Sequence, residues 1–263
     1  MTQTRIVIHG AAGRMGQRLV ALSAADPELS LVAALESSSH PRLGDDAGVV
    51  AGVGTLNVPL TDRIEVAADA VIDFTWPEPA EQLIAACVEK QLPLVLATTG
   101  FDESQTAKIR AAAERIPLLW APNMSLAVNL AMKLSEVAAR ALADQDADVE
   151  ILERHHRFKE DSPSGTALKF GQIIADAMGQ TVHRHGREGR PGKRPHEEIG
   201  YHAIRVGDNP GEHTIVFALL GEMIEITVRA TNRDAYALGA LAATKFLVDK
   251  QPGMYSISDV LGL

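Results

Sequence analysis

The segment Arg5-Ile-Val-Ile-His9 is a short run rich in β-branched residues, and Gly10-Ala-Ala-Gly-Arg-Met-Gly16 follows it directly. Leu19, Val20 and Leu22 then recur at helical spacing, so the stretch predicts a strand, a glycine turn and a helix. Glycine permits the tight turn and lets a pyrophosphate lie against the backbone, where the helix N-terminus attracts an anion. A glycine pattern by itself is a weak indication, because many such turns bind nothing.

The residues after this helix strengthen the interpretation. Residues 31–35 read as a second buried strand, and Glu36 stands at its carboxyl end. This position is about 20 residues beyond the last glycine, where an acidic side chain accepts hydrogen bonds from the ribose of an adenosine. The order of strand, turn, helix, strand and acid predicts that the chain binds a dinucleotide.

Strands and helices continue to alternate as far as residue 120. We expect strands at 70–73, 92–97 and 116–120, with helices at 79–90 and 103–115 between them. Repeated units of this kind predict an α/β fold, a Rossmann-like doubly wound parallel sheet that binds ligands across the carboxyl ends of its strands. The loops at those ends read Asp73-Phe-Thr-Trp76, Ala97-Thr-Thr-Gly-Phe101 and Ala121-Pro-Asn-Met-Ser125. Each loop either contacts nicotinamide and its ribose or is an ordinary turn with no role in binding.

A second set of elements begins after Asn123, where this alternation stops. A long apolar helix is expected over 126–142 and a strand over 149–154. The stretch 183–196 is dense in Gly, Pro, Arg and His, which predicts a mobile loop or lid. The remaining expected elements are a helix at 167–178 and strands at 199–206, 214–220 and 223–231.

These elements predict a second domain of α+β type with a mixed sheet. A final helix at 235–248 is apolar on one side and is expected to pack back against the first domain. The chain is therefore expected to form a dinucleotide-binding domain from residues 1–124 and 234–263. Residues 125–233 are expected to form a substrate-binding and oligomerisation domain.

The segment after the strand at 149–154 carries the most specific chemistry. Residues 155–166 read His-His-Arg-Phe-Lys-Glu-Asp-Ser-Pro-Ser-Gly-Thr, which places two imidazoles, an ammonium and a Ser-Gly-Thr turn together. Imidazole titrates near neutrality, and Ser-Gly-Thr before a helix turns backbone N–H groups towards an anion. The grouping suits a site that holds a dianion while delivering a proton. Taken alone, it is equally compatible with a structural histidine and a solvated basic face.

Composition narrows the classes of function. Apolar residues make up 46% of the chain, yet no stretch approaches the roughly 20 apolar residues of a membrane span. The first residues lack the layout of a secretory signal, so a cytoplasmic protein is expected. The net charge of −9 argues against a nucleic-acid or anionic-membrane surface. The histidines lack carboxylate or cysteine companions at ligand spacing, so no metal is expected.

Taken as a set, the motifs closely resemble the 4-hydroxy-tetrahydrodipicolinate reductase family, also called the dihydrodipicolinate reductases. The combination of His-His-x-x-Lys with Ser-Gly-Thr is far more specific than the glycine turn, and the resemblance spans the whole chain. The matching segments are 10–16, 73–75, 98–101, 153–159, 161–167, 187–189, 205–207, 211–213 and 221–222.

The resemblance implies reduction of 4-hydroxy-tetrahydrodipicolinate to tetrahydrodipicolinate with NADH or NADPH, in the diaminopimelate and lysine pathway. The substrate would be a cyclic, imine-containing dicarboxylate. Hydride attack on its conjugated C=C–C=N unit leaves negative charge, which a nearby cationic proton donor would neutralise. Cofactor and substrate would lie on different domains, so closure between the domains is expected before hydride transfer. Family members are typically tetramers, so a homotetramer is expected by analogy.

The family roles carry over to the matching residues of this sequence. His155 is implied as a proton donor or acceptor, Lys159 as a proton donor and His156 as a substrate contact. Gly165 and Thr166 are implied to hold a carboxylate. The residues implied to bind the cofactor are Gly10, Ala11, Ala12, Gly13, Arg14 and Met15 for the pyrophosphate, Glu36 for the ribose, and Ala97, Thr98, Thr99, Ala121, Pro122, Asn123 and Met124 for the nicotinamide end.

Departures from the family pattern bear on the cofactor. Many family members carry arginine after the ribose-binding acid, whereas Ser37 follows Glu36 here, which removes a partner for a 2′-phosphate. Arg14 replaces that partner only in part, so we expect NADH to serve at least as well as NADPH. Ala97 stands where glycine is common and brings an extra methyl group close to the cofactor. Trp76 stands where a polar or basic side chain is frequent.

Two alternatives stay open at the level of sequence. A dehydrogenase of the aspartate or homoserine type would share the first domain but lack the His-His-x-x-Lys cluster. A regulatory protein that binds NAD(H) without catalysis would not need His155 and Lys159 beside an anion cradle.

Overall fold

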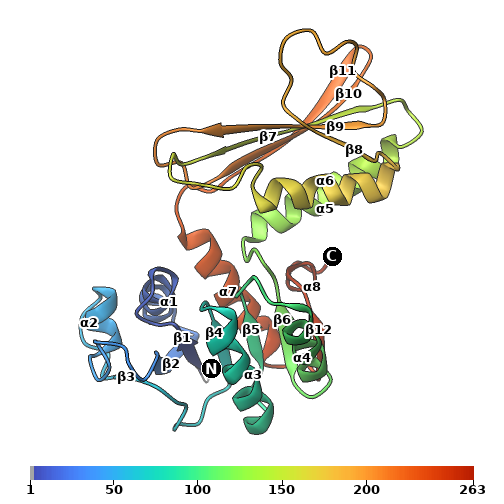
Figure 1. The fold of residues 1–263 in the computed structure, drawn as a ribbon. Helices are drawn as coiled ribbons and strands as arrows, with labels where there is room; N and C mark the ends of the chain where they lie inside the picture. The colour runs from blue at the N-terminus through green and yellow to red at the C-terminus, as the bar shows by residue number, and fades with distance from the viewer. Residues whose placement is uncertain (1–2) are drawn as a thin grey trace. The chain divides into compact units, whose positions relative to one another are not determined.

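The computed structural model describes residues 3–263, which divide into two compact units (Figure 1). Among the described residues, the first unit comprises 3–126 and Arg233–Leu263, and the second comprises Ala127–Asn232. The boundaries expected from the sequence, at residues 124 and 234, lie close to these limits; Met1 and Thr2 of the expected first domain lie outside the described residues. Within residues 3–263, no helix is both long and apolar enough to cross a bilayer.

The first unit is organised around a sheet of seven described strands, all paired in parallel. Their order is β12-β6-β5-β4-β1-β2-β3, so the chain builds the sheet outward from β1 first on one side and then on the other. This order confirms the Rossmann-like, doubly wound parallel sheet. The strands are β1 (Thr4–His9), β2 (Leu29–Leu35), β3 (Leu60–Thr61), β4 (Ala70–Asp73), β5 (Leu94–Leu96), β6 (Pro117–Trp120) and β12 (Gly253–Tyr255).

Helices cover both faces of this sheet, each face with its own apolar core. Ile6, Val7 and Ile8 of β1 have no exposed surface, because this strand lies between the two helical layers. Cys87 is fully buried in the core beneath α3 and α4, and α1, α2, α7 and α8 contribute to the other core. The helices are α1 (Arg14–Ala25), α2 (Ala47–Ala51), α3 (Pro77–Lys90), α4 (Glu103–Ala113), α7 (Asp234–Leu247) and α8 (Ile257–Leu261).

The helix α7 packs closely against the loop that follows β6. A Cβ atom on Gly239 would lie 1.8 Å from the carbonyl oxygen of Met124, so only glycine permits this approach. Ala237, Ala240 and Leu241 of α7 belong to the same core as β1. The last long helix therefore returns to the first unit, as expected, and supports one of the loops predicted to bind the cofactor.

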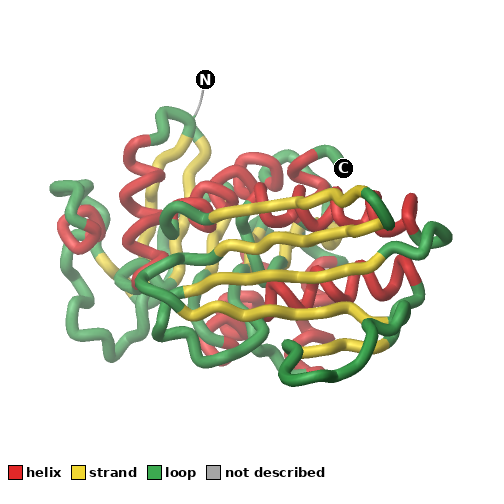
Figure 2. Tube along the Cα trace, turned by 90° about the horizontal axis from the view of Figure 1, so that it is seen from above, coloured by secondary structure: helices red, strands yellow, loops and turns green. Residues whose placement is uncertain are grey.

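The second unit is a mixed sheet with two helices against one of its faces (Figure 2). The order is β11-β10-β7-β9-β8; β7, β9 and β8 are mutually parallel, whereas β10 is antiparallel to both β7 and β11. Ile151, Phe170 and Phe217 are buried in the core between sheet and helices. This confirms the expected α+β domain with a mixed sheet. The elements are α5 (Leu126–Leu142), β7 (Asp148–His155), α6 (Gly165–Met178), β8 (Val182–His185), β9 (Glu198–Arg205), β10 (Glu212–Leu219) and β11 (Glu222–Arg229).

The expectation of a mobile loop or lid over 183–196 is wrong for its first part. Residues 183–185 belong to β8, which pairs in parallel with β9. The rest of the segment is tied to the sheet by ion pairs of Arg187 with Glu150 and Glu198, and of Arg194 with Glu150 and Asp148. A high content of glycine and proline indicated irregular backbone, but it gave no information on Glu150 and Asp148, partners that lie 37 to 46 residues away in sequence.

We expect Gly239→Ala to lower the free energy of unfolding by about 1–3 kcal/mol, because the added methyl group overlaps the carbonyl of Met124. The midpoint of urea denaturation, followed by far-UV circular dichroism, measures this effect. Leu238→Ala changes the neighbouring side chain, which is 52% exposed, and is the matched control. Equal midpoints for the two variants would contradict the close approach of α7.

Candidate functional site

The glycine turn after β1 leads into the N-terminus of α1, and its geometry suits an anion. Gly10 has a φ of +77°, and a Cβ atom on Gly16 would lie 2.0 Å from the carbonyl oxygen of Gly10. Gly13 is the N-cap of α1, and no side chain among residues 3–263 caps this end of the helix. The helix N–H groups supply partial positive charge, and the glycines keep the backbone accessible. The predicted residues 10–15 therefore fit a pyrophosphate group.

Glu36 lies beside the same turn. Its Oε1 accepts a hydrogen bond of 2.8 Å from the backbone N–H of Ala12, which holds the carboxylate at the end of β2. The hydroxyl of the following residue, Ser37, is 2.9 Å from the hydroxyl of Ser39. The acid predicted to bind a ribose thus adjoins the turn predicted to bind the pyrophosphate, as a dinucleotide requires.

Most residues predicted for the nicotinamide end gather around one pocket of about 250 Å³. Arg233 and Tyr236, from the beginning of α7, complete its wall and were missed by the sequence analysis, because they lie far along the chain in no local motif. Burial raises the pKa of Tyr236, so its hydroxyl stays protonated near neutrality. The lining residues are Met15, Phe74, Ala97, Pro122, Asn123, Met124, Arg233 and Tyr236.

Four residues predicted to bind the cofactor have buried side chains; one of them, Met124, also lines the pocket described above. Ala11 and Ala121 are buried in the core, so they offer a ligand only their backbone groups. Thr98 is 3% exposed, and its hydroxyl donates to Oδ2 of Asp73 at 2.5 Å. Thr99, by contrast, is exposed at the same loop. Only the backbone groups of Thr98 therefore remain to contact the cofactor.

Asp73 links the carboxyl ends of three neighbouring strands. Its buried carboxylate accepts the hydroxyl of Thr98 after β5 and the hydroxyl of Thr75 at 2.7 Å, and lies 2.6 Å from Nδ1 of His9 at the end of β1. A carboxylate is tolerated in a protein interior only with such partners. The cluster holds in place the sheet edge that carries the predicted cofactor residues.

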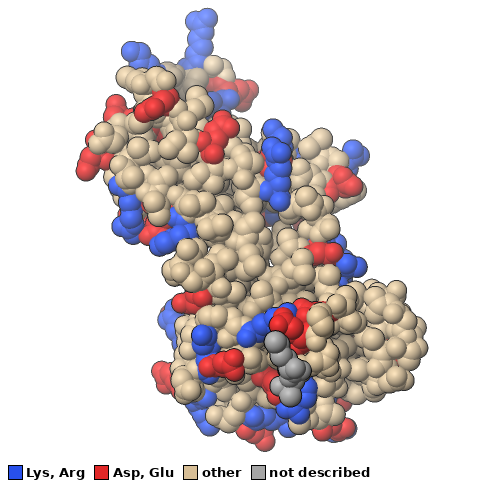
Figure 3. Space-filling model, turned by 180° about the vertical axis from the view of Figure 1, so that it is seen from behind, with Lys and Arg blue, Asp and Glu red and all other residues tan. Residues whose placement is uncertain are grey.

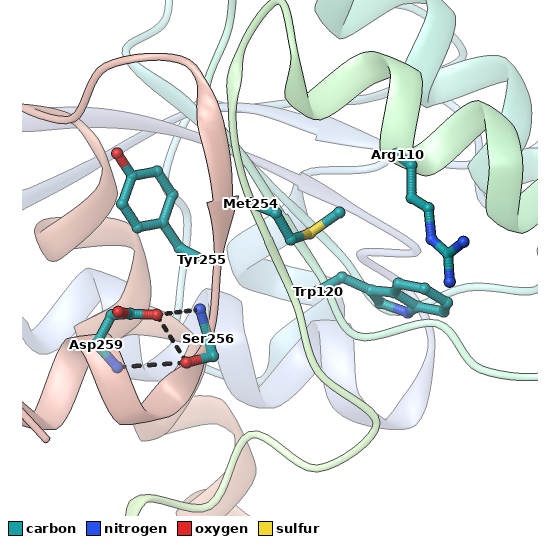
Figure 4. Close-up of a pocket in the computed structure, with 6 residues that line it drawn as sticks. All are labelled: Arg110, Trp120, Met254, Tyr255, Ser256 and Asp259. Atoms are coloured by element: carbon teal, nitrogen blue, oxygen red, sulfur yellow. Dashed lines mark hydrogen bonds between the residues drawn. The ribbon is translucent and has the colours of Figure 1, made fainter.

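A different pocket of the first unit, of about 570 Å³, lies beside β6 and β12 (Figure 4). Arg110 of α4, Trp120 and Met254 line one side of it. Ser256 and Asp259 bond to each other as the cap of α8, so their polar atoms are already engaged. None of the residues predicted to bind the cofactor is among its lining residues. We therefore do not include this pocket in the candidate site.

In the second unit, the histidine segment leaves β7 and leads into α6. Ser164 is the N-cap of α6, and its Oγ accepts the backbone N–H of Ala167 at 3.1 Å. A Cβ atom on Gly165 would meet no atom within 4 Å, so space is open beside the first turn. Gly165 and Thr166, predicted to hold a carboxylate, are the first residues of the helix, where the helix dipole favours an anion.

His155 and Glu153 project from the same face of β7, which is covered by α6. Nδ1 of His155 lies 2.5 Å from Oε2 of Glu153, and Oε1 of Glu153 accepts the backbone N–H of Ser164 at 3.1 Å. Arg205 on β9 donates to both carboxylate oxygens at 2.8 Å. Burial raises the pKa of Glu153, but hydrogen bonds from Arg205 and His155 outweigh burial and leave that pKa below its usual value. Burial lowers the pKa of His155, against the opposing effect of Glu153.

Lys159 and His156 lie in the turn after β7. Nζ of Lys159 is 2.7 Å from Oδ1 of Asp161, and the lysine side chain is only 21% exposed. The positive charge of Lys159 also contributes to the lowered pKa of His155. Nδ1 of His156 is buried and has no hydrogen-bond partner within residues 3–263. Buried polar atoms are normally paired, so this nitrogen lacks the hydrogen bond that its burial would usually require.

His213 is a member of this group to which the sequence analysis assigned no role. It lies opposite Glu153 in the register of β10 and β7, and its ring centroid is 5.2 Å from that of His155. Its Nε2 is 3.0 Å from Oγ of Ser164. Burial, aided by the charge of His155, lowers the pKa of His213 to about 4, so this imidazole is neutral at physiological pH. The alternation of β10 places the residue on the inner face, but strand pairing was needed to bring it to Glu153.

One unit contains a sheet of the dinucleotide-binding type, and the other contains imidazoles and an ammonium beside a helix N-terminus. Together these features define a dinucleotide-dependent oxidoreductase. Comparison of the sequence with known families agrees. The family description "Dihydrodipicolinate reductase, N-terminus" matches residues 4–124, and "Dihydrodipicolinate reductase, C-terminus" matches residues 127–261. The chain belongs to the dihydrodipicolinate reductase family.

Similar proteins cover nearly the whole chain. A protein of Rhodopirellula baltica named 4-hydroxy-tetrahydrodipicolinate reductase is 55% identical, over 98% of this chain and 96% of the relative. A protein of Alkalilimnicola ehrlichii with the same name is 48% identical, over 99% of each chain. The solved structure of a dipicolinate-bound dihydrodipicolinate reductase from a Paenisporosarcina species has a TM-score of 0.79 and 25% identity, covering 97% of this chain and 98% of that one.

We expect stability to fall as the pH drops from about 6.5 towards about 4, because His213 takes up a proton more readily in the unfolded chain. The stabilising effect of a neutral His213 is complete above the unfolded pKa and is lost as the pH falls through the folded value. Urea unfolding by circular dichroism across this range measures it. His213→Gln should flatten the curve, whereas the control His196→Gln, at a half-exposed position, should not. Parallel curves for wild type and His213→Gln would contradict this role.

Proposed function

We propose that the protein reduces 4-hydroxy-tetrahydrodipicolinate to tetrahydrodipicolinate with NADH or NADPH, in the diaminopimelate and lysine pathway. The single observation that carries this proposal is the grouping of His155 and Lys159 near the N-terminus of α6, in a chain whose other unit has an uncapped glycine turn. The names of the relatives and the diacid in the solved structure of the family member support it. A cyclic dicarboxylate needs both an anion site and a proton donor.

In this proposal the first unit binds the cofactor. Residues 10–15 bind the pyrophosphate, Glu36 binds the ribose, and the pocket lined by Ala97 and Asn123 takes the nicotinamide end. Ala11, Thr98 and Ala121 contribute backbone groups, since their side chains are buried, and Thr99 is free to contribute its exposed side chain. When bound, the reduced nicotinamide supplies the hydride.

The second unit binds the substrate and supplies the proton. Gly165 and Thr166 bind one carboxylate at the N-terminus of α6, and His156 contacts the substrate. Lys159 and His155 neutralise the negative charge that develops on the ring, Lys159 as proton donor and His155 as donor or acceptor. The first expected domain therefore binds the cofactor, and the second binds the substrate.

We also propose that the protein acts in the cytoplasm as a homotetramer assembled through the sheet of the second unit. Met223 and Ile224, which project from opposite faces of the edge strand β11, are 64% and 52% exposed, and exposed apolar side chains of this size are the kind that subunit contacts cover. On the face shown in Figure 3, basic side chains are interspersed with acidic ones, and the net charge is −9. This distribution supports local capture of a small anion rather than binding of a nucleic acid.

We expect kcat/KM with NADH to equal or exceed that with NADPH. Glu36 carries negative charge where a 2′-phosphate would lie, and Ser37 supplies no compensating cation. Steady-state rates with freshly generated substrate and each cofactor measure the preference. Ser37→Arg should shift the ratio towards NADPH, whereas Ser39→Arg is the control two residues further along. A strong preference of the wild type for NADPH would refute the expectation.

We expect His155→Gln and Lys159→Ala each to lower kcat by roughly 10²-fold or more while leaving the affinity for the cofactor nearly unchanged, because both act in proton delivery. Cofactor oxidation followed at 340 nm and cofactor fluorescence titration separate the two effects. Lys169→Ala removes an exposed ammonium from α6 and is the matched control. Unchanged turnover in both variants would exclude these residues from the chemistry.

A further inference from the structure

We propose that Glu153 is a positioning residue that couples the orientation of the His155 imidazole to the anion-binding end of α6. The inference rests on the proposed function for the role of His155, and it deepens that function by adding a residue that touches neither substrate nor cofactor. Its basis is that the two oxygens of one buried carboxylate are bonded to different parts of the site.

The carboxylate of Glu153 is buried between the His155 imidazole and the first turn of α6. Glu153 is 1% exposed, and its Oε2 lies 2.5 Å from Nδ1 of His155 on the same strand face. Its Oε1 accepts the backbone N–H of Ser164, the N-cap of α6, at 3.1 Å. A shift of the carboxylate would therefore move the imidazole and the first turn of the helix together.

Arg205 keeps the carboxylate of Glu153 charged and fixed in orientation. Arg205, which pairs with His155 in the register of β9 and β7, donates two hydrogen bonds of 2.8 Å to Glu153 and a third to the carbonyl of Asp161 at 2.7 Å. An isolated carboxylate in such a position would be strongly destabilising or protonated. The bidentate geometry of arginine instead defines the orientation of the carboxylate plane.

The contact with Glu153 also determines the tautomer of His155. A carboxylate accepts hydrogen bonds only, so Nδ1 must carry the proton that bonds to Glu153. The neutral imidazole then presents an unprotonated Nε2, and protonation at Nε2 gives an imidazolium stabilised by Glu153. Nε2 lies beside Gly211: a Cβ atom at residue 211 would be 3.0 Å from it, so glycine leaves the approach to this nitrogen open.

Other charged and titratable groups near His155 set the background for this interaction. Arg205 faces it from β9, His213 from β10, and Lys159 from the turn after β7. Asp161 is paired with Lys159. Glu153 is therefore the carboxylate in direct contact with the imidazole, and its removal leaves positive charges and neutral groups around the ring.

The test compares Glu153→Gln with wild type in the full-length protein. Loss of the negative charge should move the limb of the kcat/KM profile that reports His155 to lower pH by about 1 unit or more. Glutamine has a single acceptor oxygen where Glu153 has two, so either Nδ1 of His155 or the N–H of Ser164 loses its acceptor; kcat should therefore fall at least tenfold and the Kd for pyridine-2,6-dicarboxylate should rise. The Kd for NADH should stay within about twofold, because the first unit is unchanged.

Two variants control for general loss of structure. Glu150→Gln makes the same change on the same strand but on the opposite face, where Glu150 pairs with Arg187 and Arg194. It should lower stability without moving the pH profile. Glu153→Asp keeps the charge and should retain a pH profile close to that of wild type, even where the shorter side chain weakens the bond to Ser164.

A folded Glu153→Gln protein with the wild-type pH profile and wild-type kcat would overturn the proposal. If that variant does not fold, ¹⁵N NMR of histidine-labelled wild type decides: His155, assigned from the His155→Gln spectrum, must carry its proton on Nδ1, and the opposite tautomer overturns the proposal. This readout needs no turnover. An inactive wild type with the Nδ1 tautomer would refute the proposed function while supporting the positioning role.

Discussion

The parallel pairing of β1 on both of its edges is the constraint on which the first unit depends. Ile6, Val7 and Ile8 are fully buried and are flanked by β2 and β4, so the direction and end point of this strand are set by the core. Because the strand order reverses at β1, the crevice at the carboxyl ends opens where the glycine turn lies. Asp73 then bonds to groups at the ends of β1 and β5. Packing of the apolar strand β1 thus fixes the position of the polar sheet edge that is predicted to accept an anion.

The second unit places its chemistry by a different route. Its inner sheet face changes along β7 from Val149 and Ile151 to Glu153 and His155, so an apolar core passes directly into a polar cluster on the same strand. Hydrogen bonds from Arg205 and Ser164 offset the cost of burying the carboxylate. The same strand that builds the core also carries the residues proposed for proton transfer. Core stability and site geometry are therefore not independent in this unit.

Sequence patterns predicted what depends on local periodicity and missed what depends on strand pairing. The period of the apolar residues and the glycine turn were sufficient for the parallel sheet and for α5, whose limits match the expected 126–142. The short β12 and α8 carry too few residues for a period and were not anticipated. Arg233, Tyr236 and the partners of Glu153 reach the site through tertiary packing or register, which no single segment encodes. The inward turn of Thr98 likewise depends on Asp73, on another strand.

Cys87 is the only cysteine of the chain and is completely enclosed in the core beneath α3 and α4. Burial raises the pKa of its thiol, so the reactive thiolate is suppressed as long as that core is closed. Modification by a thiol reagent therefore requires this part of the first unit to open, and its rate reports the free energy of that opening. Cys87 is therefore a natural probe of local unfolding that needs no added label. Bound dinucleotide would protect its thiol from modification.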